Sequence, residues 1–191
     1  MLFPPDSGSH HPDSLAGMLH GVGEAITRIR YERLKGQLLQ GANPEVNTDR
    51  ETLISRMEQM GFRHDIVEAL HELDLKIMAA GKPLDFKACV DLTRTIYEEV
   101  AEDAAKKVAS VTGDPLPTGR VSFGPWKDLL VKAKVLTPEE GELYQRLYGY
   151  LSNVGTHQLG SEQEHVRIAK NTVIEWGLLL VGRVQALVPT P

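Results

Sequence analysis

The stretch YGYLSNVGTHQLGSEQEH, residues 148–165, contains the signals that end one helix and begin another. Gly155 is typical of a helix end because glycine readily adopts a left-handed backbone. The pattern Ser161-x-x-Glu164 is a capping box, which satisfies backbone N–H groups at the start of a helix. The stretch therefore predicts two consecutive helices joined by a short polar corner, and this corner contains His157.

Helical signals of the same kind recur along most of the chain, whereas strand signals are nearly absent. Apolar residues return every three or four positions, the spacing that places them on one face of a helix. We expect about seven helices, near residues 14–40, 48–61, 66–81, 86–111, 125–133, 137–153 and 161–187. The expected fold class is therefore all-α.

Two further helix starts are expected to carry capping boxes, Thr48-x-x-Glu51 and Thr137-x-x-Glu140, and Asp85 is expected to cap the helix of residues 86–111. The buried stripe expected in that helix is Phe86, Val90, Thr93, Tyr97, Val100, Ala104 and Val108. The stripe expected in residues 137–153 is Leu143, Leu147, Tyr150 and Leu151. The last helix is apolar almost all round near Trp176–Val181, which predicts a core helix or a subunit interface.

Breaks in this pattern divide the chain into three parts. We expect a disordered leader over residues 1–12 and an N-terminal helical part over residues 13–81. Residues 84–188 are expected to form a bundle of four helices.

Composition narrows the class of protein. Of 191 residues, 41% are hydrophobic and the formal net charge is −5, which argues against coating nucleic acid by bulk electrostatics but allows a local basic site. Cys89 is the single cysteine, so neither an internal disulfide nor a cysteine-rich zinc site can form. The first residues lack the pattern of a signal peptide and no apolar run is long enough to span a membrane, so we expect a cytoplasmic protein that does not enter a membrane.

The polar corner has two interpretations. His157 can brace the turn by hydrogen bonding to a carbonyl group, or it can exchange protons near neutral pH. The corner also precedes a helix N-terminus, where free N–H groups favour an anion, and Arg146 and Arg167 are near enough in sequence to assist.

Arg94 and Glu98 lie four residues apart and thus share one face of a helix. They can form an ordinary surface ion pair or part of a site. His64, Glu68 and His71 share another face, but no second helix offers matching ligands. We therefore predict no metal ion, and no cofactor because the chain has no phosphate-binding loop or dinucleotide motif.

A family resemblance adds to these residues. The segments DLTRTIYEEV, residues 91–100, and LYGYLSNVGTHQLGSEQEHVRIAKNTVIEWGLLLVGRV, residues 147–184, resemble the C-terminal helical domain of bacterial abortive-infection-type proteins, related to the HEPN superfamily. The resemblance covers about residues 84–188. It implies a helical bundle that dimerises and cleaves RNA at the dimer cleft without a metal ion.

The motif that the resemblance implies consists of an arginine, a polar residue and a histidine. His157 matches the histidine and Asn153 the polar residue, but Ser152 stands at the arginine position. Serine cannot stabilise phosphate charge as a guanidinium does. Arg146 is the nearest arginine on the same predicted helix, and Arg94 belongs to another helix of the bundle.

Two functions follow from the sequence. One is a HEPN-like phage-defence protein that binds RNA or another phosphate-bearing ligand near His157, with weak or no ribonuclease activity. The other is a non-catalytic helical module that forms a homodimer or binds a protein partner through its last helix.

Overall fold

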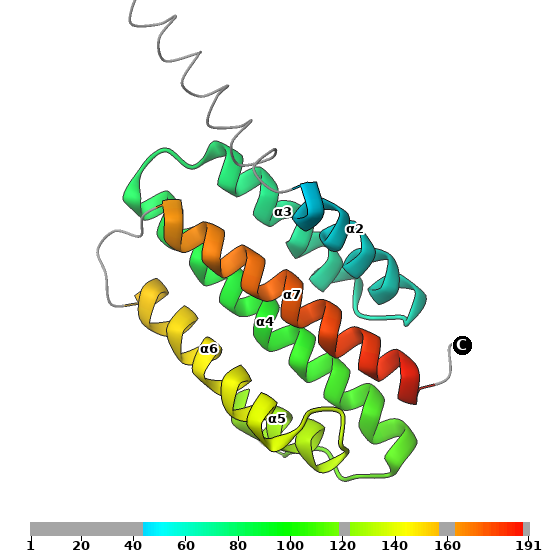
Figure 1. Ribbon diagram of the computed structural model, residues 1–191. Coiled ribbons are helices and arrows are strands. Elements are labelled where there is room, and N and C mark those ends of the chain that lie inside the picture. The colour runs from blue at the N-terminus through cyan, green and yellow to red at the C-terminus, as the bar shows by residue number, and fades with distance from the viewer. Residues whose placement is uncertain (1–43, 119–122, 157–162, 189–191) are drawn as a thin grey trace, which may run out of the picture. The chain divides into compact units, whose positions relative to one another are not determined.

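The computed structural model describes residues 44–118, 123–156 and 163–188 (Figure 1). Within these ranges the chain forms six helices and no strand, which confirms the all-α prediction for this part of the chain. They are α2 (Pro44–Gln59), α3 (His64–Ala79), α4 (Pro83–Thr112), α5 (Phe123–Lys132), α6 (Pro138–Thr156) and α7 (Gln163–Leu187). The helix expected at residues 14–40 and the leader lie outside the described residues.

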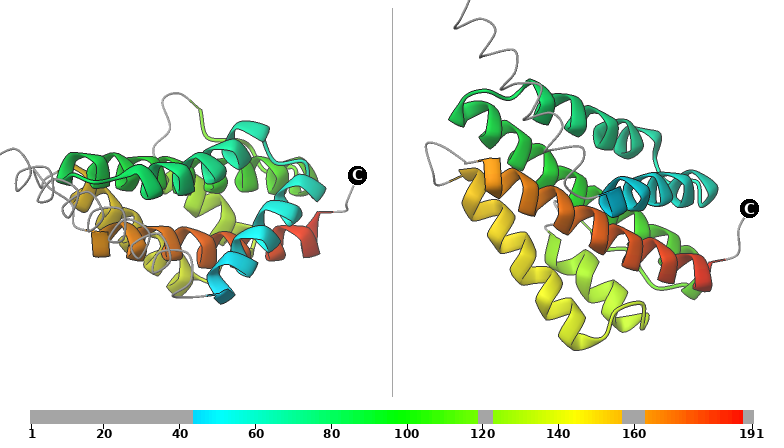
Figure 2. Two further views of the ribbon diagram at one scale, coloured as in Figure 1. Left: turned by 90° about the horizontal axis from the view of Figure 1, so that it is seen from above. Right: turned by 45° about the horizontal axis from the view of Figure 1, so that its top comes forward.

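Helices α2 to α7 belong to one compact unit with α4 at its centre. Helix α4 contacts α3, α5, α6 and α7, and α2 packs against α7 and α3. Figure 1 and the right view of Figure 2 show α7 lying along α4, with α5 and α6 on one flank and α2 and α3 on the other. No helix of the described residues is both long enough and apolar enough to cross a membrane.

The sequence explains why α4 is central. Small residues let neighbouring helices approach closely, and Ala101, Ala104 and Ala105 are all fully buried. All members of the predicted α4 stripe are buried except Phe86, which is half-buried. The hydroxyl of buried Thr93 donates a hydrogen bond to the carbonyl of Cys89 at 2.7 Å, so this polar group is satisfied within the core.

The predicted capping box of α6 is present. The backbone N–H of Thr137 donates to Glu140 Oε2 at 2.8 Å, and the N–H of Glu140 donates to Thr137 Oγ1 at 3.2 Å. The capping box expected at Thr48 does not form, because α2 begins at Pro44 and Thr48 already lies inside the helix. Proline suits the first position of a helix, which accounts for the earlier start.

Helix α4 also begins earlier than predicted. Its first residue is Pro83 rather than Phe86, so Asp85 lies in the first turn instead of preceding the helix. The Oδ2 atom of Asp85 accepts hydrogen bonds from the N–H groups of Gly81 and Lys82 at 3.0 and 2.9 Å. The aspartate therefore still stabilises the helix start, from inside the helix.

An ion-paired group links three helices on one flank of the unit. Asp74 of α3 pairs with Arg50 of α2 and with Lys170 of α7, whose Nζ lies 2.5 Å from Asp74 Oδ1. All three side chains are largely enclosed, with exposed fractions between 15% and 22%. Because one carboxylate serves two cations, its loss would leave two enclosed positive charges without a partner.

Helices α2 and α7 touch through a glycine. A Cβ atom placed on Gly177 of α7 would lie 2.8 Å from Cδ2 of Leu53, a fully buried side chain of α2. Gly177 is thus needed for close packing of the two helices.

We expect Gly177→Ala to lower the free energy of unfolding by about 1 kcal/mol, because overpacking outweighs the gain in helix propensity. Gly149→Ala is the matched control, since Gly149 also lies inside a helix but has no atom within 4 Å of an added Cβ. The control should raise the free energy of unfolding, by up to about 1 kcal/mol. Urea denaturation measures the free energy of unfolding of both variants. Equal stabilisation by Gly177→Ala and Gly149→Ala would contradict the close contact between Gly177 and Leu53.

A second link joins the start of α6 to the end of α7. Arg183 Nη2 donates to Glu140 Oε1 at 2.6 Å, and Nη1 donates to the carbonyl of Val135 at 2.9 Å. Hydrogen bonds from Arg183 and from the Thr137 N–H lower the pKa of Glu140 to about 2. A depressed carboxylate pKa stabilises the fold at pH values above the ordinary pKa of the group.

Glu140→Gln is therefore expected to lower the free energy of unfolding at pH 7 by about 1–2 kcal/mol. The difference from the parent protein should shrink as the pH falls from about 4.5 and should vanish as it approaches about 2. Urea denaturation at a series of pH values measures this. A difference that stays constant down to that pH would show that the carboxylate charge has no part in the link.

Candidate functional site

An aromatic cluster fills the space between α4, α5 and α6. The ring of Tyr148 stacks on Phe123 with centroids 4.6 Å apart, and Phe123 lies 5.1 Å from Tyr144. Tyr97 of α4 packs 4.4 Å from Tyr144, and its hydroxyl donates to the Tyr144 carbonyl at 3.1 Å. Trp176 of α7 extends the cluster, with its ring 5.3 Å from that of Tyr144. These rings fix where the Tyr148 hydroxyl lies.

The hydroxyl of Tyr148 is the centre of a polar group formed by α4 and α6. It makes side-chain hydrogen bonds with Glu98 of α4 and Ser152 of α6, and it lies within electrostatic range of Arg94. We call Arg94, Glu98, Tyr148 and Ser152 the α4–α6 polar cluster. The structure thus brings together three of the residues predicted from sequence, and it adds Tyr148, which sequence reasoning missed.

The cluster sets the ionisation of Tyr148. Burial raises the pKa of the phenol most, and the hydrogen bond and negative charge of Glu98 raise it further. Ser152, as a hydrogen-bond donor, and the positive charge of Arg94 act in the opposite direction and lower the pKa. Tyr148 therefore stays protonated near neutral pH and serves as a hydrogen-bond donor.

Arg94 is paired rather than free. Its Nε lies 3.8 Å from Glu98 Oε1, and the two side chains are 28% and 37% exposed. The Nε atom itself is enclosed and donates no hydrogen bond within the described residues. The exposed part of the side chain therefore belongs to its other atoms, which remain accessible to a ligand from solvent.

Two other predicted residues face away from this cluster. Arg146 and Asn153 are seven residues apart on α6, hence on one face, and both are exposed. Tyr144 and Leu151 are buried on the opposite side of the helix. The structure thus separates Arg146 and Asn153 from Arg94 and Glu98.

The rotation of α6 accounts for this separation. Leu143, expected in the buried stripe, is 47% exposed, whereas its neighbour Tyr144 is 1% exposed. Leu151 of the predicted stripe is fully buried, but the centre of the buried face is turned toward Tyr144, by about one residue or about 100°. That turn directs Tyr148 and Ser152 toward α4 and leaves Arg146 outside.

The polar corner itself lies outside the described residues, and His157 with it. Helix α6 continues to Thr156, so Asn153 lies in its last turn, and α7 begins at Gln163. At the start of α7, Arg167 pairs with Glu164 at 3.0 Å, and both side chains are largely exposed.

The other groups considered from sequence have structural partners or are isolated. Within the described residues, no three His, Cys, Asp or Glu side chains gather as metal ligands, and His64 pairs only with Glu68 at 3.3 Å. Glu99 pairs with Arg63 at 2.8 Å, and Asp103 accepts a hydrogen bond from the Arg63 N–H at 3.2 Å. Burial raises the pKa of the Cys89 thiol to about 11, so it is unreactive at neutral pH.

The geometry supports binding more directly than proton transfer. The cluster offers one guanidinium, one carboxylate, one protonated phenol and one hydroxyl at the junction of two helices. Comparisons with protein-family models, curated proteins and solved structures find no match to the chain.

The cluster predicts two opposite pKa changes. Glu98→Gln should lower the pKa of Tyr148, because the charge that opposes phenolate formation is removed. Arg94→Gln should raise it, because the nearby positive charge is removed. NMR titration of tyrosine labelled with ¹³C at Cζ measures the pKa in each variant.

Tyr148→Phe assigns the signal, and the remaining tyrosine signals serve as internal controls. Shifts of the same sign in both variants, or no shift in either, would show that the three side chains do not interact.

Proposed function

We propose that the chain is a HEPN-like helical protein of the abortive-infection type, which binds RNA or another phosphate-bearing ligand. The ligand would contact the α4–α6 polar cluster and His157, which follows α6 in the sequence. The observation that supports this most is that the structure groups Arg94 with Ser152. Arg94 pairs with Glu98, and Tyr148 interacts with both Glu98 and Ser152. These residues come from the two segments on which the family resemblance rests.

The chemistry of the cluster favours binding over cleavage. A ribonuclease that uses no metal needs a proton carrier and a cation that stabilises phosphate charge in the transition state. Arg94 already has Glu98 as a partner, and Ser152 stands where the nuclease motif has arginine. Any cleavage is therefore expected to be weak and to depend on His157.

In this proposal Arg94 exchanges its ion pair with Glu98 for a contact with the phosphate of the ligand. A phosphate can take the exposed part of the guanidinium while Glu98 keeps its hydrogen bond with Tyr148. The contact with Tyr148 would then keep the Glu98 carboxylate away from the phosphate. One such contact supplies a modest part of the affinity, in keeping with a chain whose net charge is −5.

Arg94→Gln is expected to weaken binding of a fluorescein-labelled single-stranded RNA by about three- to tenfold, and to reduce the slope of log K against log salt by about one. Fluorescence anisotropy at several salt concentrations measures both. Lys132→Gln is the control, since it removes the same charge at the far end of α5, where Lys132 pairs with Asp114 at 2.5 Å.

His157→Ala completes the experiment. Cleavage of the same RNA in EDTA should disappear in this variant if the parent protein shows it. Equal binding and equal salt slopes in the parent protein, Arg94→Gln and Lys132→Gln would refute the proposed site.

One observation favours the alternative, a non-catalytic module that dimerises or binds a protein partner through α7. Leu178 and Leu179 are only half-buried, and Ile168 and Leu187 are exposed on the same helix. Trp176 is also half-buried, although Leu180 is fully buried. A dimer in light scattering together with no RNA binding would select this alternative, whereas a monomer would remove most of its support.

A further inference from the structure

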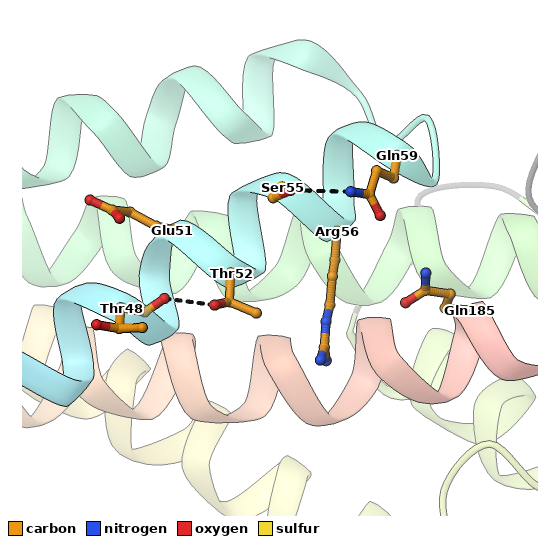
Figure 3. A pocket seen from close by; sticks show the side chains of 7 residues that line it. All are labelled: Thr48, Glu51, Thr52, Ser55, Arg56, Gln59 and Gln185. Carbon is orange, nitrogen blue, oxygen red and sulfur yellow. Dashed lines mark hydrogen bonds between the residues drawn. The ribbon is translucent and has the colours of Figure 1, made fainter.

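A polar groove lies between α2 and the C-terminal end of α7 (Figure 3), and its lining includes no residue of the α4–α6 polar cluster. Its volume is about 550 Å³, within the range of about 300–1,000 Å³ for small-molecule sites. The lining consists of polar side chains only: Thr48, Glu51, Thr52, Ser55, Arg56, Gln59 and Gln185. A groove of this composition does not suit an apolar ligand.

Helix α2 presents these groups as a regular stripe. Positions 48, 52, 55 and 59 follow one another at steps of four, three and four residues, so they share one face. All four side chains are uncharged. The Thr52 hydroxyl donates to the carbonyl of Thr48 at 2.8 Å, and Gln59 Nε2 donates to Ser55 Oγ at 3.3 Å. The hydroxyl groups of Thr52 and Ser55 and the amide of Gln59 each have further hydrogen-bonding capacity.

Arg56 supplies the positive charge. Its side chain extends across α7 in Figure 3, and its Nη1 lies 3.2 Å from the position of a Cβ atom on Gly182. Glycine at that position leaves room for the guanidinium. Glu51, the only carboxylate of the lining, is exposed and points away from the guanidinium in Figure 3.

Arg56 differs from the other half-buried arginines of the described residues. Arg50, Arg63, Arg94 and Arg183 each pair with a carboxylate. The side chain of Arg56 has no carboxylate or other hydrogen-bond partner among the described residues, although it too is half-buried. A half-buried cation without a partner, beside a row of neutral hydrogen-bonding groups, is suited to receive an anion.

We infer that this groove binds a small phosphate ester that carries hydroxyl groups. The planar guanidinium of Arg56 would take two phosphate oxygens, a geometry that lysine cannot reproduce. The hydroxyl and amide groups of α2, with Gln185 of α7, would hydrogen-bond the hydroxyl groups of the ligand. This inference is independent of the proposed RNA site, because the two share no residue.

NMR titration of the ¹⁵N-labelled full chain with ribose 5-phosphate tests the inference, with ribose and inorganic phosphate as separate probes. Ribose 5-phosphate should shift the amide signals of α2 and of Gln185. Inorganic phosphate should shift the same signals with weaker affinity, and ribose alone should shift none. Arg56→Gln should weaken the binding of ribose 5-phosphate by about tenfold, because one charged hydrogen-bonded contact is lost.

Arg167→Gln is the matched control, because Arg167 is exposed at the other end of α7 and its replacement removes the same charge. It should leave the affinity unchanged. Gly182→Ala provides a second variant that retains Arg56. Its methyl group should displace the guanidinium and weaken the binding of ribose 5-phosphate about threefold.

Three outcomes would overturn the inference. They are no shift at millimolar ester, shifts confined to the α4–α6 polar cluster, and equal affinity in the parent protein and Arg56→Gln. Thermal unfolding of each variant confirms that it is folded before the titration is interpreted.

Discussion

The burial of α4 is the constraint on which the rest of the described structure depends. Four of the other helices pack directly on it, and twelve of its residues are buried. Its alanines permit close approach, while Tyr97 fills the space toward α5 and α6. A helix surrounded on several sides can expose polar groups only at its margins, and Arg94 and Glu98 occupy such a margin beside α6.

The position of the α4–α6 polar cluster at the margin of α4 determines how far its side chains are buried. The aromatic cluster below it excludes water from one side of Tyr148, while the other side faces Glu98 and Ser152. Burial raises the pKa of the phenol, and Arg94 Nε is also enclosed. The cluster is therefore held in place by packing rather than by the ion pair alone, since an ion pair at this exposure contributes little to stability.

Sequence reasoning was most successful where the signal is local. The Thr137–Glu140 capping box and the α4 stripe were both predicted correctly, apart from Phe86, because each depends on spacing within one helix. Prolines at the starts of α2 and α4 moved two helix starts to earlier positions than the capping residues suggested. Local spacing also predicted the Arg94–Glu98 pair, which the structure contains.

Prediction from sequence was poorer for features that depend on contacts between helices. The face of α6 that is buried depends on α4 and α5, and the choice of Leu143 over Tyr144 turned the expected helix by one residue. Leu151 was correctly placed in the buried stripe, and Tyr144 and Tyr148 recur with it at helical spacing, so the sequence contained the observed stripe beside the expected one. The separation of Arg146 from Arg94 follows from that single rotation, and no property of either arginine alone could have indicated it.

The distribution of charge relates these features to function. Asp74 and Glu140 hold cations from other helices, so they stabilise the arrangement of helices and are not free to bind a ligand. Glu98 differs because its ion pair lies within one helix and its other contacts are with the uncharged side chain of Tyr148. Replacement of that ion pair by a contact with phosphate would disturb no link between helices. The α4–α6 polar cluster can therefore change partners without change of the fold, which is the physical requirement for a binding site on this surface.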